Sequence, residues 1–200
     1  MGSLSLIPQP LAGLTVVQTA AFEDHRGAFA RLFCAHELAE LGMQPIVQIN
    51  HSLTRVAGAV RGLHFQRPPK AEAKLVRCLR GRVLDVAVDL RAGSPTYLSW
   101  RAVELSALNR LALFVPRGFA HGFQTLTPDC ELLYLHDEFY SPEHEGGLRH
   151  DDPALLIPWP LPVADLSARD AAHPLLSPGF APLLIDIIDA IDTIDTKEHS

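Results

Sequence analysis

Short apolar runs separated by turn-forming residues fill the chain between about Ile46 and Tyr140. The runs KLVRCL, RVLDVAVDL, ALFVP and ELLYL each have the length of a β-strand and are rich in Val, Leu and Phe. Turn signals occur among them in AGAVRG, RPPK, RGR, RAGSPT, PRG and TPD. Many short strands with closely spaced turns are typical of a β-sandwich or barrel. The pattern predicts an all-β fold, with RGR as a tight hairpin between the strands Lys74–Leu79 and Arg82–Leu90.

The flanking segments have other patterns. The second half of Phe29–Gly42 has a helical pattern, and its final glycine is suited to cap a helix. Prolines recur after Tyr140 and exclude long regular elements, so this part is expected to wrap around the sheets with one short helix. Aspartate recurs at every third position within the last segment, 185–200, which predicts either an amphipathic helix or a disordered appendage. We therefore expect a single domain over residues 1–184, with this tail outside it.

Composition and charge narrow the function classes. A chain of 200 residues can enclose a core without metal or disulfide support. The formal net charge is −6 and no basic block is present, which argues against a nucleic-acid partner. The cysteines, Cys34, Cys78 and Cys130, are odd in number and set in apolar sequence, so we expect buried free thiols in a reducing cytoplasm. With no basic signal region and no apolar run of membrane-spanning length, no membrane association is expected.

Histidines within the expected strands indicate chemistry inside the barrel. The motif PRGFAHGF has the P-x-G-x-x-H spacing found in cupins, double-sheet jelly rolls that often hold a metal, and it would direct His121 to the interior. A metal site needs three or four suitable ligands. The other half-motif, His64-Phe65-Gln66, has glutamine where a second histidine is required, so we expect no metal.

Cationic residues accompany His64 in these strands. Arg61, Lys74 and His121 would place positive charge in the same interior, which favours a pocket that an anion enters. A lone histidine on an apolar strand is usually a core residue, but a histidine beside an anion pocket indicates proton transfer. Strict strand alternation would send Arg61 and His64 to opposite faces, whereas a bulge or bend at Gly62 would let both reach the pocket, and the sequence leaves both alternatives open.

Several motifs occur in the order found in one enzyme family: FEDHRG, VQINHS, AVRGLHFQ, KLVRCLRG, DVAVDLRAGSPT, VPRGFAHGF, DDPALLIPWP and LSARD. From about Phe22 to Leu176 the chain resembles the dTDP-4-dehydrorhamnose 3,5-epimerases. The resemblance implies a cupin-like double-sheet jelly roll with short flanking helices, and an isomerase that uses no cofactor. It also implies a dTDP-4-keto-6-deoxyhexose substrate that is inverted at C3, C5 or both in deoxysugar biosynthesis. The expected assembly is a homodimer in which an N-terminal strand crosses to the neighbouring barrel.

The resemblance assigns catalytic roles to four residues. His64 would be the general base, and Asp170 of LSARD the acid that orients and polarises it. Lys74 would lie near the carbonyl oxygen of the sugar, and Tyr134 would return the proton. The residues implied to hold the nucleotide and diphosphate, or to line the same pocket, are Arg26, Gln48, Asn50, Arg61, His121, Tyr140, Glu145 and Arg169. Removing a hydrogen next to a ketone needs a base, a stabiliser of the enolate oxygen and a proton from the other face, and the catalytic residues supply these roles.

Some positions depart from the family pattern. Arg31 stands where a glutamate usually helps to recognise the nucleotide, and Lys70 and Glu72 replace the usual residues of a PPHAQGK-type loop. The segment YLHDEFY differs from the usual YKTTDYY type, and relatives with altered flanks include enzymes that invert only one centre. The alternatives are a ketoisomerase on the same scaffold and a non-catalytic nucleotide-sugar binding module. A metal-dependent oxygenase ranks last because its ligands are missing.

Overall fold

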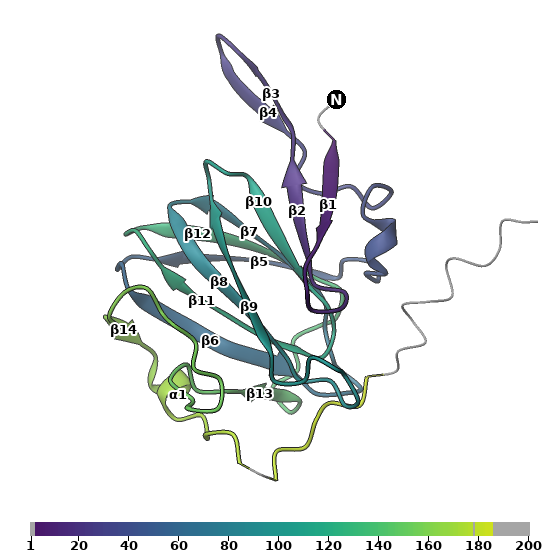
Figure 1. Cartoon of the computed structure of the whole chain (residues 1–200). Coiled ribbons are helices and arrows are strands. Elements are labelled where there is room, and N and C mark those ends of the chain that lie inside the picture. Colours follow the sequence, from purple (N-terminus) through teal and green to yellow (C-terminus); the bar gives the residue numbers. More distant parts are fainter. Residues whose placement is uncertain (1–2, 178, 186–200) are drawn as a thin grey trace, which may run out of the picture.

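Two β-sheets form the body of the molecule (Figure 1). The structure is a computed structural model and describes residues 3–177 and 179–185. The first sheet contains, in order across it, β1 (Leu4–Pro8), β2 (Thr15–Thr19), β10 (Leu111–Val115), β7 (Lys74–Arg80), β12 (Cys130–His136) and β5 (Gln48–Thr54). The second contains β13 (Glu145–Gly147), β6 (Ala59–Gln66), β11 (Phe119–Thr125), β8 (Arg82–Asp89) and β9 (Trp100–Ser106), with β14 (Asp165–Leu166) also paired to β6.

The remaining elements are short. β3 (Ala21–Asp24) and β4 (Gly27–Ala30) form a separate hairpin, η1 (Ala39–Leu41) is a 3₁₀ turn, and α1 (Ala168–Ala171) is the short helix expected after Tyr140. The side chain of Ser167 caps α1 by accepting a hydrogen bond from the backbone N–H of Asp170. The prediction of an all-β jelly roll with short flanking helices is confirmed.

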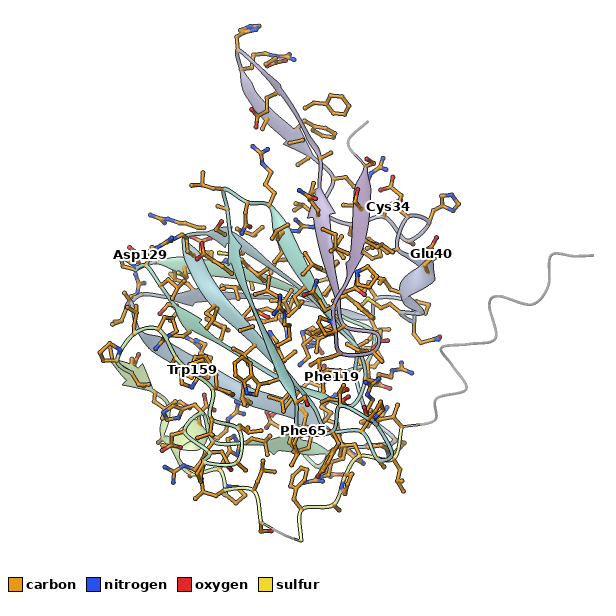
Figure 2. The ribbon with its side chains drawn as sticks, viewed as in Figure 1. Cys34, Glu40, Phe65, Phe119, Asp129 and Trp159 are labelled. Carbon is orange, nitrogen blue, oxygen red and sulfur yellow. The ribbon has the colours of Figure 1, made fainter. Side chains whose placement is uncertain are left out.

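Strand alternation sorts the apolar side chains into three clusters. The central cluster draws on both sheets and includes Phe119. A second cluster, which includes Leu38, lies on the outer face of the first sheet, where the segment from Cys34 to Ile46 packs. The third includes Phe65 and lies on the outer face of the second sheet, where the chain after β13 wraps around it (Figure 2). Most strands of each sheet are therefore packed on both faces, except β5, whose outward-facing Ile49 is 61% exposed. The polar end of the interior is left to form a site.

The expected hairpin at RGR is wrong. β7 pairs with β10 and β12, whereas β8 pairs with β11 and β9, so the chain changes sheet at Gly81. Gly81 has a φ of 77°, and a Cβ atom there would lie 2.7 Å from the sulfur of Cys130, so glycine suits this corner. Both strands are central in their sheets and mostly buried on both faces, so their sequences do not distinguish a hairpin from a crossing between sheets.

The helix expected in the second half of Phe29–Gly42 is reduced to the single turn η1. Gly42 ends this turn in the left-handed conformation with a φ of 64°, as the glycine signal predicted. No side chain caps its N-terminus, and the apolar side chains of the segment, including Leu38, pack against the outer face of the first sheet. Packing on the sheet therefore overrides a short helical pattern that would be marginal alone.

The cysteines are free thiols, as expected. Cys78 and Cys130 are buried in the central cluster. Cys34 is only half-buried, because it lies on the segment that covers the outer face of the first sheet (Figure 2). The expectation that all three are buried is therefore wrong for Cys34.

The Asp-repeat tail lies outside the described residues from position 186 onward, so its expected helix or disorder stays a prediction. Within the described ranges, no helix has the length and apolar character needed to cross a membrane.

The hairpin of β3 and β4 projects away from the two sheets (Figure 1). Arg26 lies at its turn and forms an ion pair with Asp24 at 2.6 Å. Phe22 and Phe29 on its strands are 55% and 69% exposed. The hairpin thus presents two aromatic side chains and one arginine beyond the body of its own chain.

Candidate active site

A cavity of about 610 Å³ lies between the two sheets. Its polar lining includes Gln48, Asn50, Ser52 and Thr54 of β5, Lys74 of β7, Tyr134 and His136 of β12, Arg61 and His64 of β6, His121 of β11, Glu145 of β13, Arg169 and Asp170 of α1, and Glu72 and Tyr140 from loops. Alternation explains this lining, because side chains two positions apart on a strand share a face. All the predicted site residues except Arg26 therefore meet in one cavity, with one wall from each sheet.

His64 forms a close pair with Asp170 on the wall from the second sheet. His64 Nε2 lies 2.7 Å from Asp170 Oδ1, and the backbone N–H of Gly62 donates to Asp170 Oδ2 at 3.1 Å. Burial alone would raise the pKa of Asp170, but the hydrogen bonds from His64 and Gly62 outweigh it and hold the pKa at about 2. Asp170 is then a carboxylate with no proton to donate, so Nε2 of His64 carries the hydrogen and Nδ1 is left as the basic atom.

Of the two alternatives that the sequence left open at Gly62, the bulged strand is the one found. In the pairing of β6 with β11, His64 faces His121 and Arg61 faces Phe123, so two residues of β6 oppose one residue of β11. Gly62 has a φ of 105°, and a Cβ atom there would lie 2.6 Å from the backbone oxygen of His121. The bulge breaks strict alternation and lets both Arg61 and His64 line the cavity. Arg61 Nε also donates to Thr54 Oγ1 at 2.9 Å.

Lys74 lies on the opposite wall, which belongs to the first sheet. Its side chain is 7% exposed, and its Nζ lies 2.8 Å from Oε1 of Glu72. Burial alone would raise the pKa of Glu72, but the positive charge of Lys74 and the hydrogen bond from His136 lower it to about 2. Glu72 thus stays ionised and holds the ammonium group of Lys74 within the cavity wall.

Tyr134 stands beside this lysine on the same wall. Burial raises the pKa of the Tyr134 hydroxyl well above its usual range, which keeps the proton on the oxygen. The hydroxyl lies 3.3 Å from Ser52 Oγ. The Tyr134 ring makes an edge contact with the ring of His121, with centroids 6.4 Å apart, and so joins the two walls. A protonated oxygen therefore lies on the wall opposite His64.

His121 has its own carboxylate partner. Its Nε2 lies 2.8 Å from Asp85 Oδ1, and the His121 and Asp85 side chains are 5% and 0% exposed. The expectation that His121 faces the interior is confirmed. The buried pair fixes the histidine ring where the two walls meet.

Four further predicted residues form a hydrogen-bonded rim. The backbone N–H of Tyr140 donates to Gln48, and its hydroxyl donates to Glu145 at 2.9 Å. Arg169 Nη1 lies 3.1 Å from Glu145, and its Nη2 lies 3.3 Å from Nε2 of His64. The rim therefore places a guanidinium group at the edge of the cavity beside the histidine–aspartate pair.

Arg26 does not reach the cavity of its own chain, because it lies at the turn of the projecting hairpin with a side chain that is 78% exposed (Figure 1). A role at a binding site thus requires the cavity of another chain, as the resemblance implies. Within one chain Arg26 contacts Asp24.

The cavity also contains residues that sequence reasoning left without a role. Glu72 was recognised only as a departure from the family loop, and His136 only as part of YLHDEFY. Ser52, which also lines the cavity, and Asp85, which lies behind the lining as the partner of His121, were not singled out. Alternation could have found His136, because it lies two positions after Tyr134 on the same strand and so shares its face.

One group of possible metal ligands occurs beside the site. Ligand atoms of His64, Asp170 and His173 all lie within 4.8 Å of one another. His173 Nε2 is buried without a hydrogen-bond partner among the described residues, and it lies 3.9 Å from Asp170 Oδ1. The positive charge of Arg169 disfavours binding of a cation there, because its guanidinium group lies 3.8 Å from Asp170 and 3.3 Å from His64. Sequence reasoning missed this group because His173 lies outside the cupin half-motifs.

Comparison with known proteins identifies close relatives. The family model described as dTDP-4-dehydrorhamnose 3,5-epimerase matches residues 8–178. A curated protein of that name from Sinorhizobium fredii is 46% identical over 171 residues, which are 83% of this chain and 86% of the relative.

Solved structures agree with the sequence comparison. The dTDP-4-dehydrorhamnose 3,5-epimerase of Bacillus anthracis, crystallised with TDP and PPi bound, is 42% identical and has a TM-score of 0.84, covering 87% of this chain and 100% of that one. The dTDP-6-deoxy-D-glucose-3,5-epimerase of Legionella pneumophila, in complex with dTDP-4-keto-L-rhamnose, is 39% identical with a TM-score of 0.82, covering 86% of this chain and 92% of that one. The fold and the sequence therefore lead to the same family.

Proposed function

The chain belongs to the dTDP-4-dehydrorhamnose 3,5-epimerase family, and we propose that it inverts C3 and C5 of a dTDP-4-keto-6-deoxyhexose. It is an isomerase of the epimerase class that acts in deoxysugar biosynthesis. The observation that carries the proposal is the division of the cavity into two walls. His64 with Asp170 occupies one wall, and Lys74 with Tyr134 occupies the other.

The proposed chemistry begins at the histidine. Nδ1 of His64 removes the hydrogen next to the C4 ketone, and Asp170 stabilises the imidazolium that forms. The electrons of the broken C–H bond move into an enolate, whose oxygen is stabilised by Lys74. Such a contact contributes about 3 kcal/mol, by analogy with the loss of one oxyanion-hole donor. Tyr134 then returns a proton to the opposite face of the carbon, which inverts it.

The substrate-binding roles follow the shape of the cavity. Arg61 brings positive charge and hydrogen-bond donors toward the phosphates, His121 faces the same cavity, and Arg169 supplies a cation at the rim. The other proposed binding residues are Gln48, Asn50, Tyr140 and Glu145, with Arg26 acting from a neighbouring chain.

Incubation with dTDP-4-keto-6-deoxyglucose in deuterated water tests the function. NMR should show deuterium at C3 and C5 together with inversion at both carbons. Enzyme treated with EDTA should have the same rate, because no step uses a metal. Migration of the carbonyl would favour the ketoisomerase alternative, binding without exchange would favour the non-catalytic module, and loss of turnover on chelation would assign a metal to the group at His173.

The proposed assembly is a cytoplasmic homodimer of single-domain chains. We assign residues 1–184 to one domain because Leu183 still packs in the cluster on the outer face of the second sheet. The exposed Phe22 and Phe29 of the projecting hairpin suit burial against a second copy of the chain, which would carry Arg26 toward the partner's cavity. The free cysteines suit a reducing compartment.

Mixed dimers test this assembly directly. Light scattering should give about twice the chain mass of 21.9 kDa. Arg26→Ala and His64→Ala chains should each form weakly active or inactive dimers, because one lacks a phosphate contact and the other lacks the base. When the two chains are co-expressed, each mixed dimer should regain one normal site, in which an intact cavity receives an intact hairpin. A fully active monomer, or no recovery in mixed dimers, would contradict the exchange.

A further inference from the structure

The residues that depart from the family pattern contact one another. In the loop before β7, Lys70 and Glu72 replace the usual residues. Lys70 Nζ lies 3.2 Å from Glu138, and Glu72 Oε2 lies 2.8 Å from His136 Nδ1, and both partners belong to the altered segment YLHDEFY. The Lys70–Glu138 pair lies at the surface, whereas the Glu72–His136 pair lines the cavity. The two altered segments are therefore structurally coupled.

His136 is paired with a buried carboxylate, as His64 is with Asp170, but through Nδ1 of the ring instead of Nε2. The side chains of Glu72 and His136 are 11% and 10% exposed, and the carboxylate also holds Lys74 at 2.8 Å. Because Glu72 stays ionised, Nδ1 of His136 carries a hydrogen and donates it to the carboxylate. Nε2 of His136 is then the ring atom that can gain or lose a proton.

The surroundings of His136 accept either protonation state of that atom. Nε2 lies 3.5 Å from the amide of Asn50, which can offer its N–H to a neutral ring or turn its oxygen toward a protonated one. The ring stacks against Tyr134 with centroids 6.1 Å apart and an interplanar angle of 20°. On the neighbouring strand, His136 is directly opposite Lys74.

Tyr134 and His136 thus stand on the same wall, two residues apart, which is about 7 Å along a strand. A substrate with its ketone at Lys74 has one acidic carbon on each side of that ketone. Two proton donors at this spacing provide one for each carbon.

We propose that His136, positioned by Glu72, is a second proton donor, which returns the proton at one of the two inverted carbons while Tyr134 serves the other. This inference rests on the proposed function. At each carbon His64 takes a proton and the C–H electrons form the enolate; the O–H bond of Tyr134 or the Nε2–H bond of protonated His136 then breaks, and its proton forms the new C–H bond on the other face. Afterwards His64 releases a proton to water and the donor takes one from water, so the site returns to its starting state.

His136→Asn and Glu72→Gln test the proposal in deuterated water. His136→Asn should admit deuterium at C3 and C5 through His64, while inversion at one carbon falls by about 10²-fold or more and the other keeps its rate. Glu72→Gln also removes the carboxylate that holds Lys74, so it should slow exchange at both carbons and slow inversion further at the one carbon that His136 serves. Glu72→Gln preserves the size of the side chain and removes its charge, so it provides a second variant if His136→Asn folds poorly. His36→Asn replaces an exposed histidine outside the cavity and is the matched control.

The stereochemical pattern separates a donor from a structural residue. Equal slowing at both carbons in the two variants, or no slowing at either, would overturn the role of His136. A wild-type enzyme that inverts a single carbon would overturn it as well, because Tyr134 alone would then be sufficient. Absence of exchange in the wild-type enzyme would instead reject the proposed function itself.

Discussion

His64→Ala should abolish both proton exchange and inversion at every carbon, because without the base no enolate forms. Removal of a general base typically costs about 10²–10⁴-fold in rate, so the residual reaction is measurable in a long incubation. The measurement is the NMR time course of deuterium entry and of product formation in deuterated water. The side chain of His64 faces the cavity, whereas the residues on either side of it in β6 are buried in the core. Replacing His64 with alanine should therefore leave the fold intact, which circular dichroism would check.

Asp170→Asn refines this result. The amide keeps the shape of the side chain but no longer stabilises the imidazolium, so exchange and inversion should fall together at all carbons. Loss of a proton donor, in contrast, should slow inversion more than exchange.

Deuterium entry at the normal rate in His64→Ala would show that another group is the base. His173 lies nearest to Asp170 among the remaining histidines near the cavity and would be the next candidate.

The strand pattern alone predicted that His64 and Lys74 share one interior, and both face the cavity. Tyr134 also faces the cavity, but only the resemblance to the family singled it out. The one position that alternation misplaces is Arg61, and Gly62 supplied the signal for the bulge that corrects it.

Features that depend on packing between distant segments were not predictable. The change of sheet at Gly81 can be identified only when the strands that pair with β7 and β8 are known. The apolar patterns of these two strands do not indicate which strands they pair with. The turn at Ala39–Leu41 is short because contacts with the first sheet compete with helix formation. The Glu72–His136 pair joins residues 64 positions apart, so nothing local to either residue indicates it.

Tyr134→Phe should separate exchange from inversion. Phenylalanine fills the same volume and removes only the hydroxyl, whose described partner is Ser52 Oγ at 3.3 Å, so the cavity wall should be preserved. The enolate still forms over Lys74, and solvent deuterium can enter from the face of His64 with retention of configuration. The doubly inverted product should therefore nearly disappear, with a loss of about 10²–10⁴-fold, while deuterium still enters the starting sugar.

Ser52→Ala is the control for this variant, because it removes the hydrogen bond to Tyr134 and keeps the tyrosine hydroxyl. It should slow inversion far less than Tyr134→Phe, since burial still keeps the tyrosine protonated. The measurement is the ratio of inverted product to deuterated starting sugar at each carbon. If Tyr134→Phe inverts both carbons at the wild-type rate, Tyr134 is not a donor at either carbon. The proton on that wall must then come from His136, from Tyr140 at the rim or from water.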